Sequence, residues 1–94
     1  MNIMILGSGG REHAISWKIS QSKSCKNLYV APGNAGTSLV GNNIPININD
    51  FEEVKKNVIE RSIDLVIVGP EEPLVNGIVD FFKSDNKLKN IKIF

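Results

Sequence analysis

The clearest structural signal in the sequence is Ile3-Met4-Ile5-Leu6-Gly7-Ser8-Gly9-Gly10-Arg11-Glu12-His13, where an apolar run leads directly into a glycine-rich turn. The run predicts a buried strand over residues 2–6, and the residues after the turn predict a helix from Arg11 to about Gln21. A strand, a glycine turn and a helix in this order present backbone N–H groups at a helix N-terminus. Such an end of a helix favours an anionic ligand, so the stretch predicts a phosphate-binding loop.

The acidic residue that would make this loop a dinucleotide site is missing. A nicotinamide- or flavin-binding domain carries an Asp or Glu at the end of its second strand, about 20 residues beyond the glycines. Here no acidic residue lies between Glu12 and Asp50, and Glu12 itself replaces the third glycine of the fingerprint. The dinucleotide-binding Rossmann domain of an oxidoreductase is therefore the alternative, and phosphate binding is the favoured interpretation.

The composition sets broad limits on the class of protein. Ninety-four residues with 41% hydrophobic content predict one small globular domain. The net charge of +1 gives no electrostatic reason for binding nucleic acid or a membrane, and we expect neither. The single cysteine, Cys25, excludes an internal disulfide and fits a reducing compartment. We therefore expect a monomer in the cytoplasm.

Strand and helix patterns alternate along the chain. Strands are predicted at 2–6, 27–31, 44–48, 64–68 and 91–94, with 44–48 an edge strand because Pro45 cannot donate to a ladder. Asp50 is predicted to cap one helix, and Pro73 to begin another. The expected inward residues are Ala14, Ile15 and Ile19 in the first helix, Phe51, Val54 and Val58 in the second, and Val75, Ile78, Val79 and Phe82 in the third.

This alternation predicts an α/β fold of the Rossmann-like type, with a mainly parallel sheet of about five strands between two helical layers. Right-handed crossovers favour the strand order 3-2-1-4-5. The chain ends at the last predicted strand, which we interpret as a domain of a longer protein.

Three unusual loops each follow a strand: Gly7 to His13, Pro32 to Thr37, and Gly69 to Pro73. In a parallel sheet all three lie at the carboxyl edge, where open α/β sheets bind their ligands. The first loop offers backbone N–H groups with the positive charge of Arg11, and the second offers Asn34 and Thr37. The third places Glu71 and Glu72 at a helix start. Each loop also has an ordinary structural interpretation, because turns need glycine and helix starts favour acids.

No catalytic group is evident in the sequence. His13 is the only histidine and has no partner at metal-ligand spacing, so we expect a structural role and no metal site. Cys25 lies in a polar stretch without a histidine nearby in sequence, which argues against a catalytic thiol. No lysine of a nucleotide-binding loop follows the glycines. The chain is predicted to hold a small phosphorylated ligand without activating it.

The three loops together closely resemble the phosphoribosylamine–glycine ligase family, also called glycinamide ribonucleotide synthetase, of purine biosynthesis. The matching segments are Gly7-Ser8-Gly9-Gly10-Arg11-Glu12-His13-Ala14, Ala31-Pro32-Gly33-Asn34-Ala35-Gly36-Thr37 and Val68-Gly69-Pro70-Glu71-Glu72-Pro73-Leu74-Val75-Asn76-Gly77. They occur in the family's order and spacing, and the resemblance covers the whole chain.

The resemblance implies an ATP-grasp enzyme that joins glycine to 5-phosphoribosylamine with ATP and Mg²⁺ or Mn²⁺, through a glycyl phosphate. It implies that residues 1–94 are the N-terminal preATP-grasp domain, and that ATP and the metal bind to the rest of the parent chain. The residues implied to line the phosphoribosylamine site are Gly9, Gly10, Arg11, Glu12, Asn34, Gly36 and Thr37, with Glu71 holding ribose hydroxyls. The 94 residues alone are expected to be inactive.

A third class of function is a small flavodoxin-like interaction or regulatory domain. A domain of that class needs an acidic receiver-type site after its first strand. Here Ile3 to Leu6 leads into glycines instead, which argues against it.

Overall fold

Five parallel strands form one sheet in the order β3-β2-β1-β4-β5 in the computed structural model, which describes residues 1–94. The predicted strand order is therefore confirmed. None of the helices reaches the length and apolarity needed to cross a membrane. The elements are β1 (Asn2–Gly7), α1 (Gly10–Ser20), β2 (Asn27–Pro32), the 3-10 helix η1 (Thr37–Leu39), β3 (Asn42–Asn43), α2 (Phe51–Glu60), β4 (Leu65–Val68), α3 (Glu71–Val75), α4 (Ile78–Ser84) and β5 (Lys92–Ile93).

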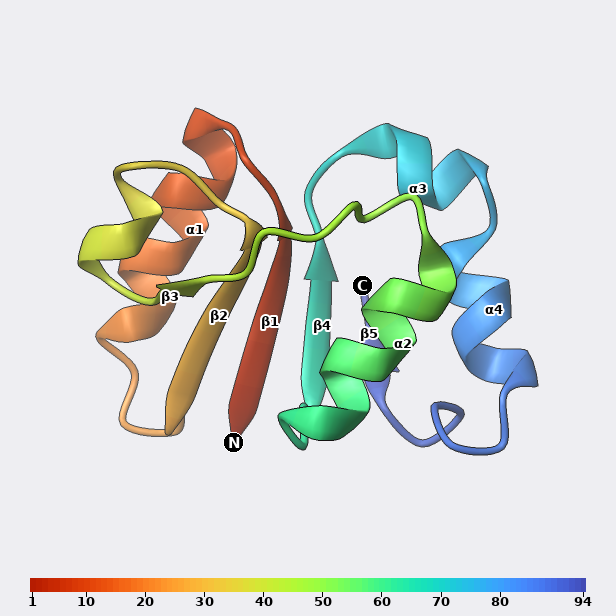
Figure 1. Cartoon of the computed structure of the whole chain (residues 1–94). Coiled ribbons are helices and arrows are strands. Elements are labelled where there is room, and N and C mark those ends of the chain that lie inside the picture. The colour runs from red at the N-terminus through yellow and green to blue at the C-terminus, as the bar shows by residue number, and fades with distance from the viewer.

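The sheet separates two cores of unequal size. Met4 and Leu6 of β1 belong to a cluster of 13 buried residues that also includes residues of α2 and α4. Ile3 and Ile5 point to the opposite face, in a cluster of 4 buried residues packed against α1. Alternate side chains of a strand face opposite sides of its sheet, so the apolar run serves both cores. The result is the expected three-layer fold, with α1 on one face and α2 and α4 on the other (Figure 1).

The third strand is not where the sequence pattern placed it, and the prediction of a strand at 44–48 is wrong. β3 consists of Asn42 and Asn43, which pair with Tyr29 and Val30. The N–H of Ile44 still donates to Val30 O at 2.8 Å, but Pro45 has no N–H to continue the ladder. The apolar residues that follow reach the core without pairing as a strand.

The helix expected to start at Pro73 is two short helices. Gly77, with φ of 89°, adopts the left-handed conformation and separates α3 from α4. Pro73 is the third residue of α3 and is buried, whereas Val75 is 82% exposed and does not face the core. Ile78 and Phe82 of α4 are buried as predicted.

The inward face of α1 differs in part from the prediction. Ile15 and Ile19 pack against the smaller core as expected, but Ala14 is exposed. The buried residues of this helix are Glu12 and Ser16, whose hydroxyl donates to Glu12 O at 2.6 Å. Two polar residues therefore occupy the inner face next to the glycine turn.

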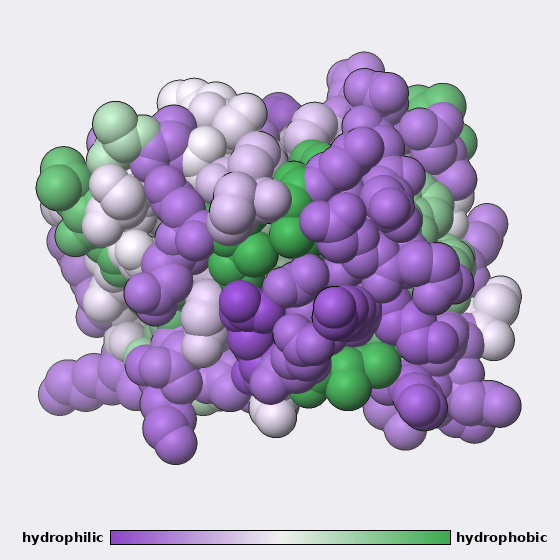
Figure 2. All heavy atoms as spheres, in the orientation of Figure 1, coloured by the Kyte–Doolittle hydropathy of each residue, from purple (hydrophilic) through white to green (hydrophobic).

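The start of α2 is as predicted. The side chain of Asp50 caps the helix by accepting from the N–H of Glu53 at 3.2 Å, and Val54 and Val58 are buried. Lys55 donates to Asp85 at 2.6 Å and so joins α2 to the segment after α4. Hydrophilic side chains dominate the outer side of this layer, with apolar atoms in small areas (Figure 2).

Candidate functional site

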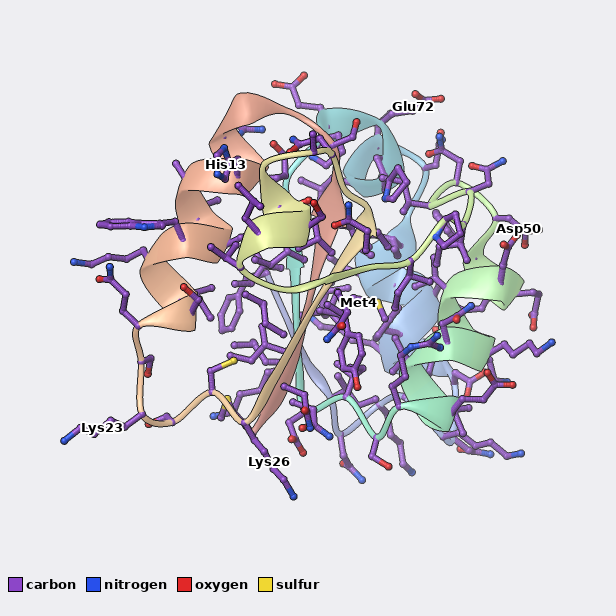
Figure 3. The ribbon with its side chains drawn as sticks, turned by 60° about the vertical axis from the view of Figure 1, so that its left-hand side comes forward. Met4, His13, Lys23, Lys26, Asp50 and Glu72 are labelled. Atoms are coloured by element: carbon purple, nitrogen blue, oxygen red, sulfur yellow. The ribbon has the colours of Figure 1, made fainter.

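The three loops that follow β1, β2 and β4 meet at the carboxyl edge of the sheet, because β1 lies between the other two strands. The N–H of Gly33 donates to Gly7 O at 3.0 Å, which ties the second loop to the first. In Figure 3, His13 and Glu72 lie toward this edge, whereas Lys23 and Lys26 lie at the opposite edge. The strand order thus brings together loops that are far apart in the sequence, at the point where such sheets bind ligands.

Asn34 joins the first two loops through its side chain. Its amide nitrogen donates to Ser8 O at 2.9 Å and to Gly9 O at 3.2 Å. Its amide oxygen accepts from the N–H of Thr37 at 3.0 Å. Both amide hydrogens and the oxygen are therefore bonded within the protein. Asn34 holds the loops in place, and its side chain has no hydrogen free for a ligand in this arrangement.

Thr37 lies beneath the second loop and has no exposed surface. Its hydroxyl accepts from the N–H of Asn34 at 2.7 Å and lies 2.7 Å from Asn43 Oδ1. Asn43 in turn donates from its side-chain nitrogen to Asn34 O at 2.8 Å. The structure therefore brings Thr37 to the site as an internal support of the loop. Its hydroxyl does not reach the surface.

Glu12 occupies the crevice between the loops after β1 and β4. It is 5% exposed, and a methyl group at Gly7 or at Gly69 would overlap its carboxylate. A methyl group at Gly9 would lie 3.2 Å from its second oxygen. Glycine is therefore required at Gly7 and Gly69 because the Glu12 side chain fills the space that a side chain there would take. A φ of 139° at Gly7 adds a second reason.

Arg11 links the first loop to the third. Its guanidinium donates to Gly69 O, while most of the side chain remains exposed. Around it, the backbone N–H groups of Ser8, Gly9 and Glu12 have no acceptor within the chain. Gly10 is exposed, with open space where a side chain would stand. Unpaired N–H groups beside a guanidinium form an electropositive rim.

His13 packs against Gly36 of the second loop, where a methyl group would overlap the imidazole ring. The imidazole ring of His13 therefore fills the space beside Gly36. Gly10, His13, Ala14 and Trp17 also line a shallow hollow on the outer side of α1. The hollow borders the loop edge without entering the crevice that holds Glu12.

Glu71 and Glu72 form the first turn of α3, and both are exposed. They lie at the carboxyl edge, but neither carboxylate makes a hydrogen bond or an ion pair within the chain. Carboxylates in a first helical turn are favoured by the helix dipole. Their position therefore fits both the structural and the ligand-binding interpretation.

The role of Asn43 could not be predicted, since an Asn in a short polar strand has no distinguishing pattern. Gly7 ends β1 and Gly69 follows β4, and because these two strands are neighbours the two glycines lie on either side of Glu12. Their spacing in the sequence does not reveal that the side chain between them is that of Glu12.

Neither a reactive thiol nor a cluster of metal-ligating side chains is found at the carboxyl edge. Burial raises the pKa of the Cys25 thiol, and its sulfur lies 3.6 Å from Asn27 O. A raised pKa lowers the fraction of thiolate, the nucleophilic form. No three His, Cys, Asp or Glu side chains gather in one place.

Comparisons with known proteins identify the relatives of this chain. The family model described as "Phosphoribosylglycinamide synthetase, N domain" matches residues 1–94. Phosphoribosylamine–glycine ligase of Clostridium acetobutylicum is 47% identical over 94 residues, which are all of this chain and 22% of the relative. The enzyme of that name from Mesorhizobium japonicum is also 47% identical over 94 residues, which are 21% of its length.

A solved structure is similar as well. The crystal structure of phosphoribosylamine–glycine ligase from Thermotoga maritima matches with a TM-score of 0.60 and 35% identity, over 77% of this chain and 16% of that one. The chain thus spans about a fifth of the length of the curated relatives it matches. None of these matches supports the oxidoreductase alternative.

Proposed function

Because this chain belongs to the phosphoribosylglycinamide synthetase N-domain family, as its sequence resemblance predicts, we propose that it is the substrate-binding N-terminal domain of a phosphoribosylamine–glycine ligase. That enzyme joins glycine to 5-phosphoribosylamine in purine biosynthesis. The observation that carries the proposal is the joining of the three motif-bearing loops at one edge of the sheet. The family assigns the activity to a much longer protein, so this domain supplies a part of its site.

The residues divide into two groups under this proposal. Gly9, Gly10 and Arg11 supply donors at the rim, and Glu12 and Glu71 supply carboxylates to the same edge. Asn34, Gly36 and Thr37 hold the second loop against α1. The expected contact of Asn34 and Thr37 with substrate becomes a positioning role, because their polar atoms are bonded to the protein.

ATP and the divalent metal of the ligase reaction are proposed to bind to the rest of the parent chain. The residues of this domain do not fit either group, since no cluster of carboxylates gathers and no lysine follows the glycines. The domain itself therefore binds and orients a sugar phosphate and performs no group transfer. We propose that the parent enzyme is cytoplasmic.

A domain swap tests the proposal. In the Clostridium acetobutylicum ligase, the matching N-terminal segment is replaced by these 94 residues. We expect glycine-dependent and phosphoribosylamine-dependent ADP formation by the chimera, and none by the 94-residue chain alone. A folded chimera without activity would contradict the proposal, as would turnover by the isolated chain.

A thermal-shift comparison tests the ligand class on the isolated chain. Ribose 5-phosphate should raise the unfolding temperature, because a ligand that binds only the folded state stabilises it. NAD should have no effect. The reverse result would favour the oxidoreductase alternative.

A further inference from the structure

Glu12 is the only charged residue among the buried residues of the chain. Its carboxylate takes part in no hydrogen bond and no ion pair. No completely enclosed side-chain nitrogen or oxygen lacks a partner, so the unbonded carboxylate must keep a narrow opening to solvent. A carboxylate in this state has lost most of its hydration without a replacement, and a ligand with hydrogen-bond donors would restore it.

The surroundings of Glu12 also contain donors. Asn34 binds Ser8 O and Gly9 O, and these two carbonyls belong to trans peptides. In a trans peptide the N–H points opposite to the C=O. The N–H groups of Gly9 and Gly10 are therefore turned away from the Asn34 side chain, and that of Gly9 has no acceptor in the chain. A methyl group built at Gly9 would lie 3.2 Å from a carboxylate oxygen of Glu12, so this unpaired donor and the carboxylate acceptor are close to each other.

A carboxylate next to a backbone N–H distinguishes between the two ends of a sugar phosphate. A hydroxyl or amino group donates to a carboxylate, and a hydroxyl also accepts from an N–H. A phosphate has acceptors and negative charge, and a nearly buried carboxylate repels it strongly because little solvent screens the two charges. The two ends therefore differ in their fit to the crevice.

We infer that Glu12 receives a hydroxyl or amino group of the sugar at the solvent opening of the crevice between the loops after β1 and β4, and that the phosphate binds away from this opening. The inference rests on the proposed function and adds an orientation to it. Under this inference Glu12 determines which end of the ligand faces the opening.

The acid at position 12 also has a purely structural explanation, and the test must distinguish this explanation from ligand binding. It is the third residue of α1, where an acid or an amide stabilises a helix start. Glu12→Gln keeps the shape and the helix preference but removes the charge and one acceptor. Glu53 is the third residue of α2, so Glu53→Gln is the matched control.

The experiment titrates the chain and both variants separately with ribose 5-phosphate and with inorganic phosphate, by NMR. We expect Glu12→Gln to weaken ribose 5-phosphate binding about tenfold, which corresponds to about 1.4 kcal/mol. Inorganic phosphate should bind this variant as well as the wild type or better, and Glu53→Gln should change neither affinity. Equal loss of both ligands, or loss of neither, would overturn the inference.

The wild type provides a readout that does not depend on a variant. The amide resonances of Gly7 and Gly69, which flank the carboxylate, should shift with ribose 5-phosphate and not with inorganic phosphate. Equal shifts with both ligands would overturn the inference and leave the proposed function standing. If wild-type protein binds no ribose 5-phosphate at all, the proposed ligand class itself fails, and the inference with it.

Discussion

The start of α2 has a side-chain cap, whereas the start of α1 has none. Asp50 caps α2 with its side chain, which accepts the N–H of Glu53. Gly9 takes the same position before α1 and has no side chain to do this. The third residue of each helix is a glutamate, but Glu53 is partly exposed and Glu12 is buried.

The start of α2 is stabilised by its own residues, whereas the start of α1 keeps N–H groups that a ligand could use. Each helix start leaves several N–H groups without intrahelical partners. In α2 a side chain satisfies one of them locally. In α1 the neighbouring loops are instead held in place by Asn34 and Arg11, and the N–H groups remain available.

The largest loss of stability is expected at Gly7, where the Glu12 side chain leaves no room for a methyl group. Gly7→Ala places a methyl group on the Glu12 carboxylate at a φ of 139°, and we expect a loss of about 3 kcal/mol of unfolding free energy. Urea unfolding measures it. Gly10→Ala is the control, because Gly10 has open space around it, and its effect should stay within about 1 kcal/mol. Equal effects of the two substitutions would refute the crowding.

The second effect concerns the link between the loops at α1. Asn34→Asp replaces the amide donor by an oxygen that faces Ser8 O and Gly9 O, and we expect a loss of about 2 kcal/mol. Asn49, whose exposed side chain makes no hydrogen bond, provides the control Asn49→Asp. Urea unfolding of both variants measures the loss. An Asn34→Asp protein as stable as the control would show that the hydrogen bonds from Asn34 to the first loop do not stabilise the fold.

The third effect tests the closed start of α2. Asp50→Ala removes the cap and should cost about 1 kcal/mol, whereas Asp50→Asn keeps an acceptor and should cost only a fraction of that. Thermal or urea unfolding distinguishes them. If both substitutions cost the same, the negative charge and not the hydrogen bond stabilises this helix start.

The smallest effect is a pH dependence of the pair that anchors α2. The hydrogen bond from Lys55 lowers the pKa of Asp85, with a smaller contribution from the N–H of Lys87, and the same bond raises the pKa of Lys55. A carboxyl with a lowered pKa stabilises the fold above the usual Asp pKa of about 4, and the stabilisation is lost as the pH falls through the lowered value. The wild type should have a larger free energy of unfolding than the Lys55→Met variant, and this difference should be smaller at pH 3 than at pH 7. Equal advantages at both pH values would contradict the role of this pair.

The sequence predicts the strands and their order better than the roles of the polar residues. β1 and β4 are short apolar runs bounded by turns, and such runs identify buried parallel strands directly. β3 has no such signal, because Asn42 and Asn43 pair through their backbone at an edge. The nearby isoleucines alternate for a different reason, since they fill the core.

The candidate site divides in the same way. The motifs correctly place the three loops at one edge, because strand order follows from the pattern of elements. The individual roles of Glu12, Asn34 and Thr37 depend on the path of each loop. An Asn that binds a ligand and an Asn that binds two carbonyls look the same in the sequence, and only the geometry around Ser8 and Gly9 separates them.

The central position of β1 also has a consequence for synthesis of the chain. β1 is translated before the other strands of the sheet, yet Ile3 pairs with Leu65 on one side, so this side stays unpaired until most of the domain has been translated. An apolar strand with an open edge is a template for wrong pairing. β2 and α1 follow β1 closely and cover its other side and one face early. The nascent chain therefore carries one exposed edge, and the arrival of β4 closes it.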